Sequence, residues 1–579
     1  MPAVNPYTKD VLKIYKKKSY TSCDKSKSFI AVVYDRSTQN YSLHISERNL
    51  KCCYKQIKRT GSGNKADEEY KLLPCKEFPQ DFVVPRQVDA ILTECRRSKS
   101  RAIVQRDAFS FVQANRVVNK TVPKPSKRRP NVLLWGMDSI SRMNFERTMP
   151  IMHKYLKDKQ WFELQGYNKM ADNTFPNLMA LLTGFNYSRS EDVCNPYKVG
   201  ALDSCPLLWK DYKRQGYMTA YAEDWGRFST FNYKKRGFLK PPTDFYAHPH
   251  VLAIEHELKI VIDTGIPYCV GRRHYAEYIY DMALQFTEVY KNHSTFGMFW
   301  ANSFSHNNFA LPSSMDSKIL EYMQKLNQTG TFDSSIVIFF SDHGMRFGPL
   351  RRLESGFLEE RMPIMYIWLP LWFRAEYPEF VRALKLNRNR LTSPYDIHAT
   401  LRHILDLEQP LAQLPRPEGC PACHSVFYEI TKERDCPMAG IDGHWCTCLH
   451  FERLPNDDST SKIIAGQLVA AINDYIVQRN LTDICHTLNL TNIELVQRTK
   501  KFGTQKSEVY LIRYETAPFN SIFEASTDWS PTSRKISINV PDISRLDPYS
   551  QLSMCVEGNV DKKFCICNDV EEVSAGTLL

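Results

Sequence analysis

Three short segments of this sequence carry residue types that can hold a metal ion and attack an ester. Asp138 ends WGMD, Thr174 lies in DNTFPN, and adjacent Asp342 and His343 follow the apolar run IVIFFS. Carboxylate and imidazole groups suit Zn²⁺ and can leave one position open for a substrate. A metal beside the Thr174 hydroxyl would lower the pKa of that hydroxyl, as it does for water. The segments together predict a metal-assisted nucleophile.

The stretch DNTFPNLMALLTG, residues 172–184, reads as the start and end of one helix. Thr174 stands in a capping position, Pro176 falls in the first turn, and Gly184 marks the stop. A capping Thr is usually structural. It can also be a nucleophile whose anionic substrate receives the free N–H groups of the helix start. The order of the three segments favours the nucleophile.

The elements that would position these residues alternate between strands and helices. Apolar strands that end in polar residues are expected within 131–144, 216–226, 294–308 and 334–348, with amphipathic stretches at 148–158 and 272–286. This alternation predicts an α/β fold with a mostly parallel sheet covered on both faces. Ligands of such sheets bind at the carboxyl ends of the strands, where the polar residues fall.

The SDHG of residues 341–344 and a nucleophile helix ending in LTG resemble the alkaline-phosphatase superfamily. Its members include phosphatases, nucleotide pyrophosphatase/phosphodiesterases, sulfatases and phosphoethanolamine transferases, and TFPN is similar to the nucleophile segment of the phosphodiesterase branch. Through AEDWG, SDHGMRFG, LEERMP and GHWCTC the whole chain resembles an animal family within it that is labelled a domain of unknown function. The resemblance implies a central sheet between helices and one metal site made of Asp138, Thr174, Asp342 and His343.

A second metal site is an open question. Relatives use an Asp and a His four residues apart, plus a later His. Here His306 has the right place in chain order, but the position four before it is Asn302, whose amide is a poorer ligand than a carboxylate. We expect His306 to contact the metal or the substrate. The later ligand has five candidates: His398, His403, His424, His444 and His450.

Three further residues are weaker candidates. Asn195 lies 21 residues beyond Thr174, close to where the phosphodiesterase branch places an oxyanion-stabilising Asn, although a loop role beside a disulfide is the alternative. Glu223 and Asp224 would orient the metal ligands from behind, or cap the turn at Gly226.

The predicted function is a metal-dependent hydrolase of phosphoesters that works through a covalent phosphothreonine at Thr174. One alternative is transfer of a phosphoethanolamine-type group to a glycan or glycolipid, and another is an inactive extracellular binding protein. A formylglycine sulfatase is disfavoured, because those enzymes modify a Cys or Ser followed by x-Pro-x-Arg. Here the residue is Thr174, and Leu178 replaces the Arg.

Composition indicates a large globular protein of an oxidising compartment. The 579 residues are 43% hydrophobic and include 17 cysteines, which excludes disordered and collagen-like classes and predicts disulfides with one thiol left over. No apolar run reaches the roughly 18 residues of a membrane span, and no signal peptide is visible in residues 1–20. Since the cysteines and seven sequons favour a secreted or lumenal protein, we expect the true N-terminus to lie upstream. The sequons begin at Asn40, Asn119, Asn186, Asn292, Asn327, Asn480 and Asn489.

Charge and cysteine placement divide the chain into three predicted regions. A basic, cysteine-containing N-terminal region spans 1–129, the catalytic core spans 130–450, and a disulfide-bearing C-terminal region spans 451–579. Residues 1–130 hold 28 Lys/Arg and 12 Asp/Glu, a net charge of +16, so the remainder of this +12 chain is at −4. The basic region could attract lipid headgroups or acidic glycans, or be a solvated face. Nucleic acid fits poorly with sequons and disulfides.

Overall fold

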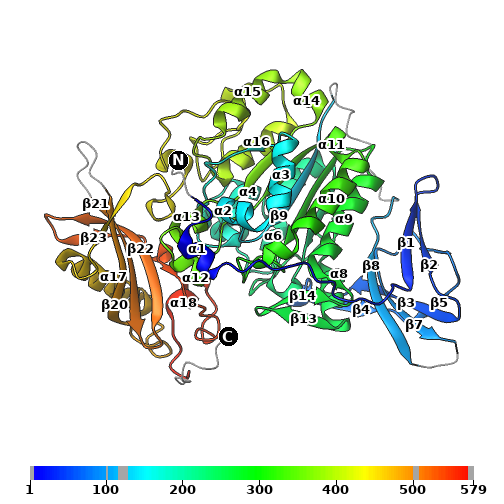
Figure 1. Ribbon diagram of the computed structural model, residues 1–579, viewed down its shortest axis with the longest axis horizontal. Coiled ribbons are helices and arrows are strands. Elements are labelled where there is room, and N and C mark those ends of the chain that lie inside the picture. Colours follow the sequence, from blue (N-terminus) through cyan, green and yellow to red (C-terminus); the bar gives the residue numbers. More distant parts are fainter. Residues whose placement is uncertain (1–4, 99–101, 115–127, 500–507, 571–579) are drawn as a thin grey trace.

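The centre of the molecule is a seven-stranded sheet in a computed structural model that describes residues 5–98, 102–114, 128–499 and 508–570 (Figure 1). In spatial order its strands are β10 (Phe162–Glu163), β18 (Met365–Trp368), β17 (Ser335–Phe340), β9 (Asn131–Met137), β16 (Thr295–Ala301), β11 (Met218–Glu223) and β12 (Phe245–Tyr246). The five strands from β17 to β12 are parallel, whereas β18 is antiparallel to both of its neighbours. The predicted mostly parallel α/β sheet is therefore confirmed.

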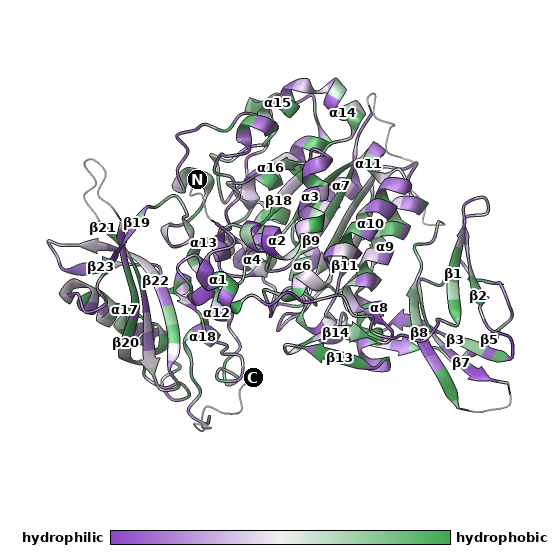
Figure 2. Cartoon of the chain, viewed as in Figure 1, coloured by the Kyte–Doolittle hydropathy of each residue, from purple (hydrophilic) through white to green (hydrophobic). Residues whose placement is uncertain are grey.

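Helices cover both faces of this sheet, as the continuous apolar strands predicted. On β9, Leu133, Trp135 and Met137 belong to one buried cluster, and Val132 and Leu134 belong to the cluster on the opposite face. The first face is covered by α2 (Arg142–Thr148), α3 (Pro150–Asp158), α9 (Tyr275–Val289) and α10 (Asp316–Gln328). The second is covered by α4 (Thr174–Thr183), α7 (Leu208–Arg214), α14 (Leu371–Glu376), α15 (Pro378–Asn387) and α16 (Pro394–Leu405). Figure 2 shows hydrophobic residues concentrated along the central strands.

Shorter elements connect the central layers. They are α5 (Tyr187–Cys194), α6 (Ala201–Ser204), α8 (His248–Glu257), α11 (Thr331–Ser334), α12 (Pro349–Arg352), α13 (Gly356–Arg361) and a small sheet of β13 (Ile260–Asp263), β14 (Ile266–Val270) and β15 (Arg273–His274). No helix among the described residues is long and apolar enough to cross a membrane. The longest apolar run of the sequence, 362–373, forms β18 and the beginning of α14.

The N-terminal region forms two small sheets beside the core and a helix that lies on it (Figure 1). The elements are α1 (Lys9–Ile14), β1 (Ile30–Asp35), β2 (Asn40–Ile45), β3 (Leu50–Arg59), β4 (Tyr70–Leu72), β5 (Lys76–Phe78), β6 (Phe82–Val83), β7 (Ala90–Arg97) and β8 (Ile103–Ser110). Val11 of α1 is buried against Phe309 and Met345. The Cys23–Cys269 disulfide also joins this segment to the core, so the start of the chain is part of the central body.

The C-terminal region is an antiparallel sheet packed on one long helix. Its elements are β19 (Phe451–Leu454), α17 (Ser459–Gln478), β20 (Asn489–Thr499), β21 (Glu508–Ala517), β22 (Ser521–Ser530), β23 (Lys535–Ser537), β24 (Ser544–Arg545) and α18 (Asn559–Phe564). Buried ion pairs attach it to the core. Glu524 of β22 pairs with Arg351 of α12, and Arg351 lies 2.7 Å from Glu360 of α13. Removing one member of such a buried network costs about 3–5 kcal/mol.

The predicted disulfides are confirmed. Eight bonds join Cys23–Cys269, Cys52–Cys95, Cys53–Cys75, Cys194–Cys205, Cys420–Cys423, Cys436–Cys446, Cys485–Cys565 and Cys555–Cys567. Cys448 is the free and exposed thiol. The bonds link strands and loops far apart in sequence as well as neighbours, a pattern typical of proteins of an oxidising compartment.

Candidate active site

The carboxyl ends of two adjacent parallel strands bring the predicted metal ligands together. Asp138 follows β9 directly, and Asp342 and His343 follow β17, its neighbour. One ligand atom from each of the three lies within 4.8 Å of the others, and all three side chains are buried. Ser139 adopts a left-handed φ of 60°, and its N–H donates to Asp342 Oδ1 at 3.3 Å. A left-handed φ is uncommon for a residue other than glycine, and here it shapes the turn after Asp138 so that the Ser139 N–H reaches Asp342.

The imidazole of His343 presents one nitrogen to the site. Its Nδ1 donates to the Gly344 carbonyl at 2.8 Å, so in the neutral ring Nε2 is an acceptor. That nitrogen lies 3.1 Å from Asp342 Oδ2 and 3.7 Å from Asp138 Oδ1. The Thr174 hydroxyl lies 3.4 Å from the same nitrogen. All four residues thus converge on one point.

The charges and hydrogen-bond acceptors at this group of residues favour a bound cation. Asp342 Oδ2 is buried and receives no hydrogen bond of ordinary geometry from the described residues. Two acceptors, this oxygen and His343 Nε2, therefore face each other. Burial raises the pKa of Asp138 to about 7, and burial with the Asp138 charge raises the pKa of Asp342 to about 7. Burial also holds the pKa of His343 well below its usual range. Two buried carboxyls that release their protons near pH 7 and a neutral imidazole fit a divalent cation.

The cap of α4 differs from the prediction by one residue. The N-cap is Asn173, with extended backbone and no side-chain capping bond, so the prediction that Thr174 occupies the capping position is wrong. Thr174 is the first helical residue, and its hydroxyl faces His343 instead of its own helix. The loop before it is held by Asn177, whose Oδ1 accepts the Met170 N–H at 2.9 Å. Gly184 ends the helix in a left-handed conformation with φ of 74°, as predicted.

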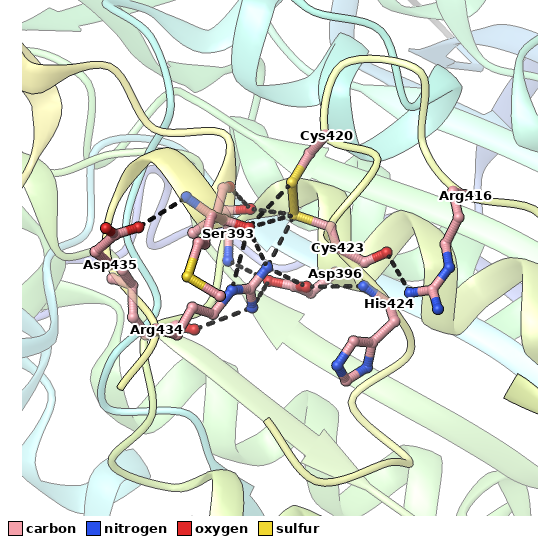
Figure 3. The surroundings of a disulfide bond; sticks show 11 residues. Ser393, Asp396, Arg416, Cys420, Cys423, His424, Arg434 and Asp435 are labelled. Carbon is pink, nitrogen blue, oxygen red and sulfur yellow. Dashed lines mark hydrogen bonds and ion pairs between the residues drawn. A yellow bond between two sulfur atoms is a disulfide. The ribbon is translucent and has the colours of Figure 1, made fainter. Parts of the chain in front are cut away.

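A disulfide and a buried ion pair lie beside α4 and the loop that precedes it. The Cys420–Cys423 disulfide packs against Ala171 in the loop that precedes α4. Arg434 makes two bonds of 2.9 and 3.0 Å to the Asp396 carboxylate and donates to Cys423 Sγ at 3.0 Å (Figure 3). This buried ion pair fixes the first turn of α16, which packs along α4.

His306 approaches the site from the neighbouring strand β16. Its Nδ1 bonds to Asn307 Oδ1 at 2.5 Å, and its Nε2 lies 3.8 Å from Asp138 Oδ2. Burial lowers the pKa of His306 to about 4, so the ring is neutral near pH 7. It is placed to contact either a metal or a substrate oxygen.

Asn302 uses both ends of its amide within the protein. The Nδ2 group donates to Glu223 Oε1 at 3.0 Å, and Oδ1 accepts the indole N–H of Trp300 at 3.0 Å. An amide committed in this way is not directed at a metal. The Asn302 side chain is therefore a structural link to β11.

Glu223 and Asp224 hold the loop that carries His306. Asp224 accepts the Asn302 N–H at 2.6 Å, and the His306 N–H donates to the Asn302 carbonyl at 3.1 Å. Burial raises the pKa of Glu223 to about 7 and that of Asp224 to about 6. The Gly226 N–H itself donates to Glu255 at 2.8 Å, but Glu223 Oε1 accepts the Thr230 N–H at 2.9 Å in the turn that follows Gly226.

The remaining candidates bond elsewhere. Asn195 Oδ1 accepts the Tyr197 N–H at 3.1 Å, a contact within its own turn. The buried or half-buried histidines His398, His403, His424 and His444 bond to Leu181, Ser425, Ser425 and Ser544, respectively. His450 is exposed, and none of the five belongs to the Asp138 group.

Arg346 is a site residue that the sequence argument did not single out. Its guanidinium lies 3.6 Å from Asp172, two residues before Thr174, and its charge acts on the pKa values of Asp138 and His343. Burial opposes ionisation of Asp172, but Lys563 and Arg346 hold the pKa of that carboxyl below its usual range. Arg346 lies in SDHGMRFG, three residues after His343, in a segment that forms no helix, so the sequence offered only its closeness to the ligand pair as a signal.

The sequence matches the model of a family described as "Protein of unknown function (DUF229)" over residues 16–494. The chain belongs to this family. That membership agrees with the resemblance to a family of unknown function noted from its motifs. No curated protein matches the chain.

Solved structures of the alkaline-phosphatase type share its outline at low similarity. Phosphonate monoester hydrolase of Agrobacterium radiobacter is 12% identical, covering 70% of this chain and 90% of its own, with a TM-score of 0.35. A protein in the alkaline phosphatase superfamily from Vibrio parahaemolyticus is 12% identical, covering 76% and 86%, with a TM-score of 0.34. The lipoteichoic acid synthase LtaP from Listeria monocytogenes is 13% identical, covering 42% and 66%, with a TM-score of 0.29.

Proposed function

We propose that this chain is a metal-dependent hydrolase of phosphoesters in which Thr174 forms a covalent phosphothreonine. The observation that carries the proposal is the convergence of a hydroxyl, an imidazole nitrogen and two buried carboxylates on one point. A structural cap would need none of these partners.

Asp138, Asp342, His343 and Thr174 are the residues that would hold the ion, and their oxygen and nitrogen donors suit Zn²⁺. When bound, such an ion would lower the pKa of the hydroxyl and offset the negative charge of the phosphoryl group. The two carboxylates need an ion of charge +2 for neutrality, since His343 is uncharged at this position.

The chain's own residues account for the remaining chemistry. Thr174 loses its hydroxyl proton to solvent as Oγ1 forms a bond to phosphorus and the bond from phosphorus to the leaving oxygen breaks, and the leaving oxygen takes up a proton from solvent. The first N–H groups of α4 face the phosphoryl oxygens, and Arg346 supplies a fixed positive charge nearby. Water then attacks the phosphothreonine, so phosphate leaves and the Thr174 hydroxyl is restored.

Transfer to an acceptor other than water is the second candidate. The observation that favours it is the commitment of Asn302 to Glu223 and Trp300, which leaves a single cation site of the kind found in phosphoethanolamine transferases. In that reaction a glycan or glycolipid hydroxyl would replace water in the second step. The first step and its residues would be the same.

A panel of phosphomonoester, phosphodiester and sulfate ester substrates tests the proposal. We expect turnover of at least one phosphoester class with added Zn²⁺, and loss of that turnover in Thr174→Ala. Activity on sulfate esters alone would contradict it, and so would full activity of metal-free protein. A product that carries the transferred group on an added glycan would select the transferase.

The eight disulfides and the sequons support a secreted or lumenal location. Asn186, Asn292, Asn327, Asn480 and Asn489 are exposed and Asn40 is partly exposed, whereas Asn119 lies outside the described residues. The predicted contact of the basic N-terminal region with lipid headgroups or acidic glycans stays a prediction.

A further inference from the structure

Three lysines gather beside the start of α4. Lys234 and Lys235 lie in the loop after β11, and Lys562 lies in α18 of the C-terminal region. Lys562 is near enough to Lys234 and Lys235 that their charges act on its pKa. Lys235 and Lys562 are only 7% and 6% exposed, whereas Lys234 is exposed. Two of these three cations are thus removed from water.

The cluster has no anionic partner in the part of the chain that the structure describes. The Lys235 ammonium donates to the Tyr233 carbonyl at 3.2 Å, and the Lys562 ammonium donates to the Glu557 carbonyl at 2.7 Å. Neither forms an ion pair, and the nearby acidic groups, Glu223 and Glu191 for Lys235 and Glu557 for Lys562, act only at longer range. Adjacent Lys563, by contrast, lies 3.7 Å from Asp172.

Buried like charges without a counter-ion are unfavourable in a free protein. Burial and then the nearby Lys234 lower the pKa of Lys562 to about 7, and burial lowers the pKa of Lys235 to about 8. Such an arrangement is destabilising unless something else compensates for it. An anionic ligand that enters between the ammonium groups would remove this cost.

The position of the cluster connects it to the nucleophile. The Lys235 ammonium lies 4.8 Å from the ring centre of Phe175, the residue that follows Thr174. A substrate whose phosphoryl group reacts at Thr174 would therefore extend past the start of α4 toward the lysines.

A row of rings links the same cluster to His306. Trp225 packs edge-on against His306 at 5.4 Å and stacks on Phe228 at 4.5 Å. Phe228 in turn stacks on Tyr233 at 4.8 Å, and the Lys234 ammonium lies 5.3 Å from the centre of the Tyr233 ring. Phe228 is 45% exposed and Trp225 only 9%, so the row, which runs from His306 to the lysines, reaches the surface at Phe228.

We propose that Lys234, Lys235 and Lys562 form a subsite for a second anionic group of the substrate, a phosphate, sulfate or carboxylate that does not react at Thr174. The inference rests on the proposed function in one respect, because it takes Thr174 as the reacting end. It identifies the substrate class as an ester that carries an additional negative charge.

The test measures binding rather than turnover, in full-length Thr174→Ala protein. The probes are a hexose bisphosphate and the matching hexose monophosphate, and a disulfated disaccharide with its monosulfated counterpart. We expect the member with two anionic groups in at least one pair to bind about tenfold or more tightly than the member with one, as a charge-assisted hydrogen bond allows. The pair that shows the preference distinguishes phosphate from sulfate.

Lys562→Gln should remove most of the preference for the probe with two anionic groups. It should leave the affinity for the probe with one anionic group within about twofold of that of the parent. It should also melt no lower than its parent, because it removes repulsion. Lys234→Gln, at an exposed position, gives the same readout if Lys562→Gln folds poorly. Lys462→Gln removes an exposed charge from α17 and is the matched control.

An unchanged preference in both Lys562→Gln and Lys234→Gln would overturn the subsite, as would the absence of any preference in the parent. These outcomes are separate from failure of the proposed function. That failure would appear as turnover by Thr174→Ala, whatever the binding results.

Discussion

Replacing Thr174 with alanine separates a nucleophile from a structural helix residue. The hydroxyl lies 3.4 Å from His343 Nε2, and the N-cap of α4 is Asn173, which makes no side-chain capping bond. The loss of about 0.5–2 kcal/mol that follows removal of an N-cap side chain therefore does not apply. We expect the free energy of unfolding of Thr174→Ala to stay within about 0.5 kcal/mol of wild type, because alanine is also the better helix former.

The activity should behave quite differently. Removal of a nucleophile in a cooperative catalytic group lowers turnover by about 10⁴-fold or more, or more than about 5 kcal/mol of activation free energy. Thr174→Ser is the matched control, since it keeps the attacking oxygen and should retain measurable activity. Urea denaturation measures the stability, and initial rates on the best phosphoester of the panel measure the activity. Turnover by Thr174→Ala within a few-fold of wild type, on a substrate that needs the metal, would refute the reasoning.

Zinc content, the pH dependence of metal affinity, the pH dependence of stability and glycosylation can each be measured. Protein purified without chelator should contain about one zinc per chain by elemental analysis, and Asp342→Ala should lose it; a wild type that contains no metal, together with an Asp342→Ala variant that folds and is as active as wild type, would contradict the site. The raised pKa values of Asp138 and Asp342, about 7 each without metal, mean that both carboxyls release protons when the ion binds, so metal affinity should rise as pH rises from 5 to 7. The same raised pKa values affect the stability of metal-free, chelated protein. Between about pH 4 and 7 its folded state holds protons that the unfolded state has already lost, so its free energy of unfolding should fall as pH rises. A melting temperature that does not change with pH in calorimetry would contradict this. A glycan-cleaving amidase should lower the apparent mass of native protein, whereas no shift together with reduced cysteines would indicate a cytosolic protein.

Local patterns in the sequence were sufficient for the parallel core and for one half of the site. The segments before Asp138 and Asp342 have apolar residues at successive positions, as expected of strands that are buried on both faces. The structure shows β9 and β17 to be such strands. Parallel strands place their carboxyl ends at one edge. The convergence of Asp138, Asp342 and His343 could therefore be predicted without coordinates.

Other features depend on contacts that no local pattern encodes. The Asn302 amide is not free to bind a metal, because the folded sheet places Glu223 at its Nδ2 and Trp300 at its Oδ1. The disulfide partners of adjacent Cys52 and Cys53 differ because neighbouring side chains of a strand point to opposite faces.

The lysine subsite shows this division most clearly. Lys235 and Lys562 are separated by more than three hundred residues, and each alone reads as a surface charge. Only the docking of α18 against the core removes both from water and puts Lys562 beside Lys234. Strand and helix formation follow from periodicity within about ten residues, but the cost of an unpaired buried charge depends on every group around it. The sequence alone therefore determined the sheet and the residues at its edge, and tertiary packing determined what surrounds the reacting point.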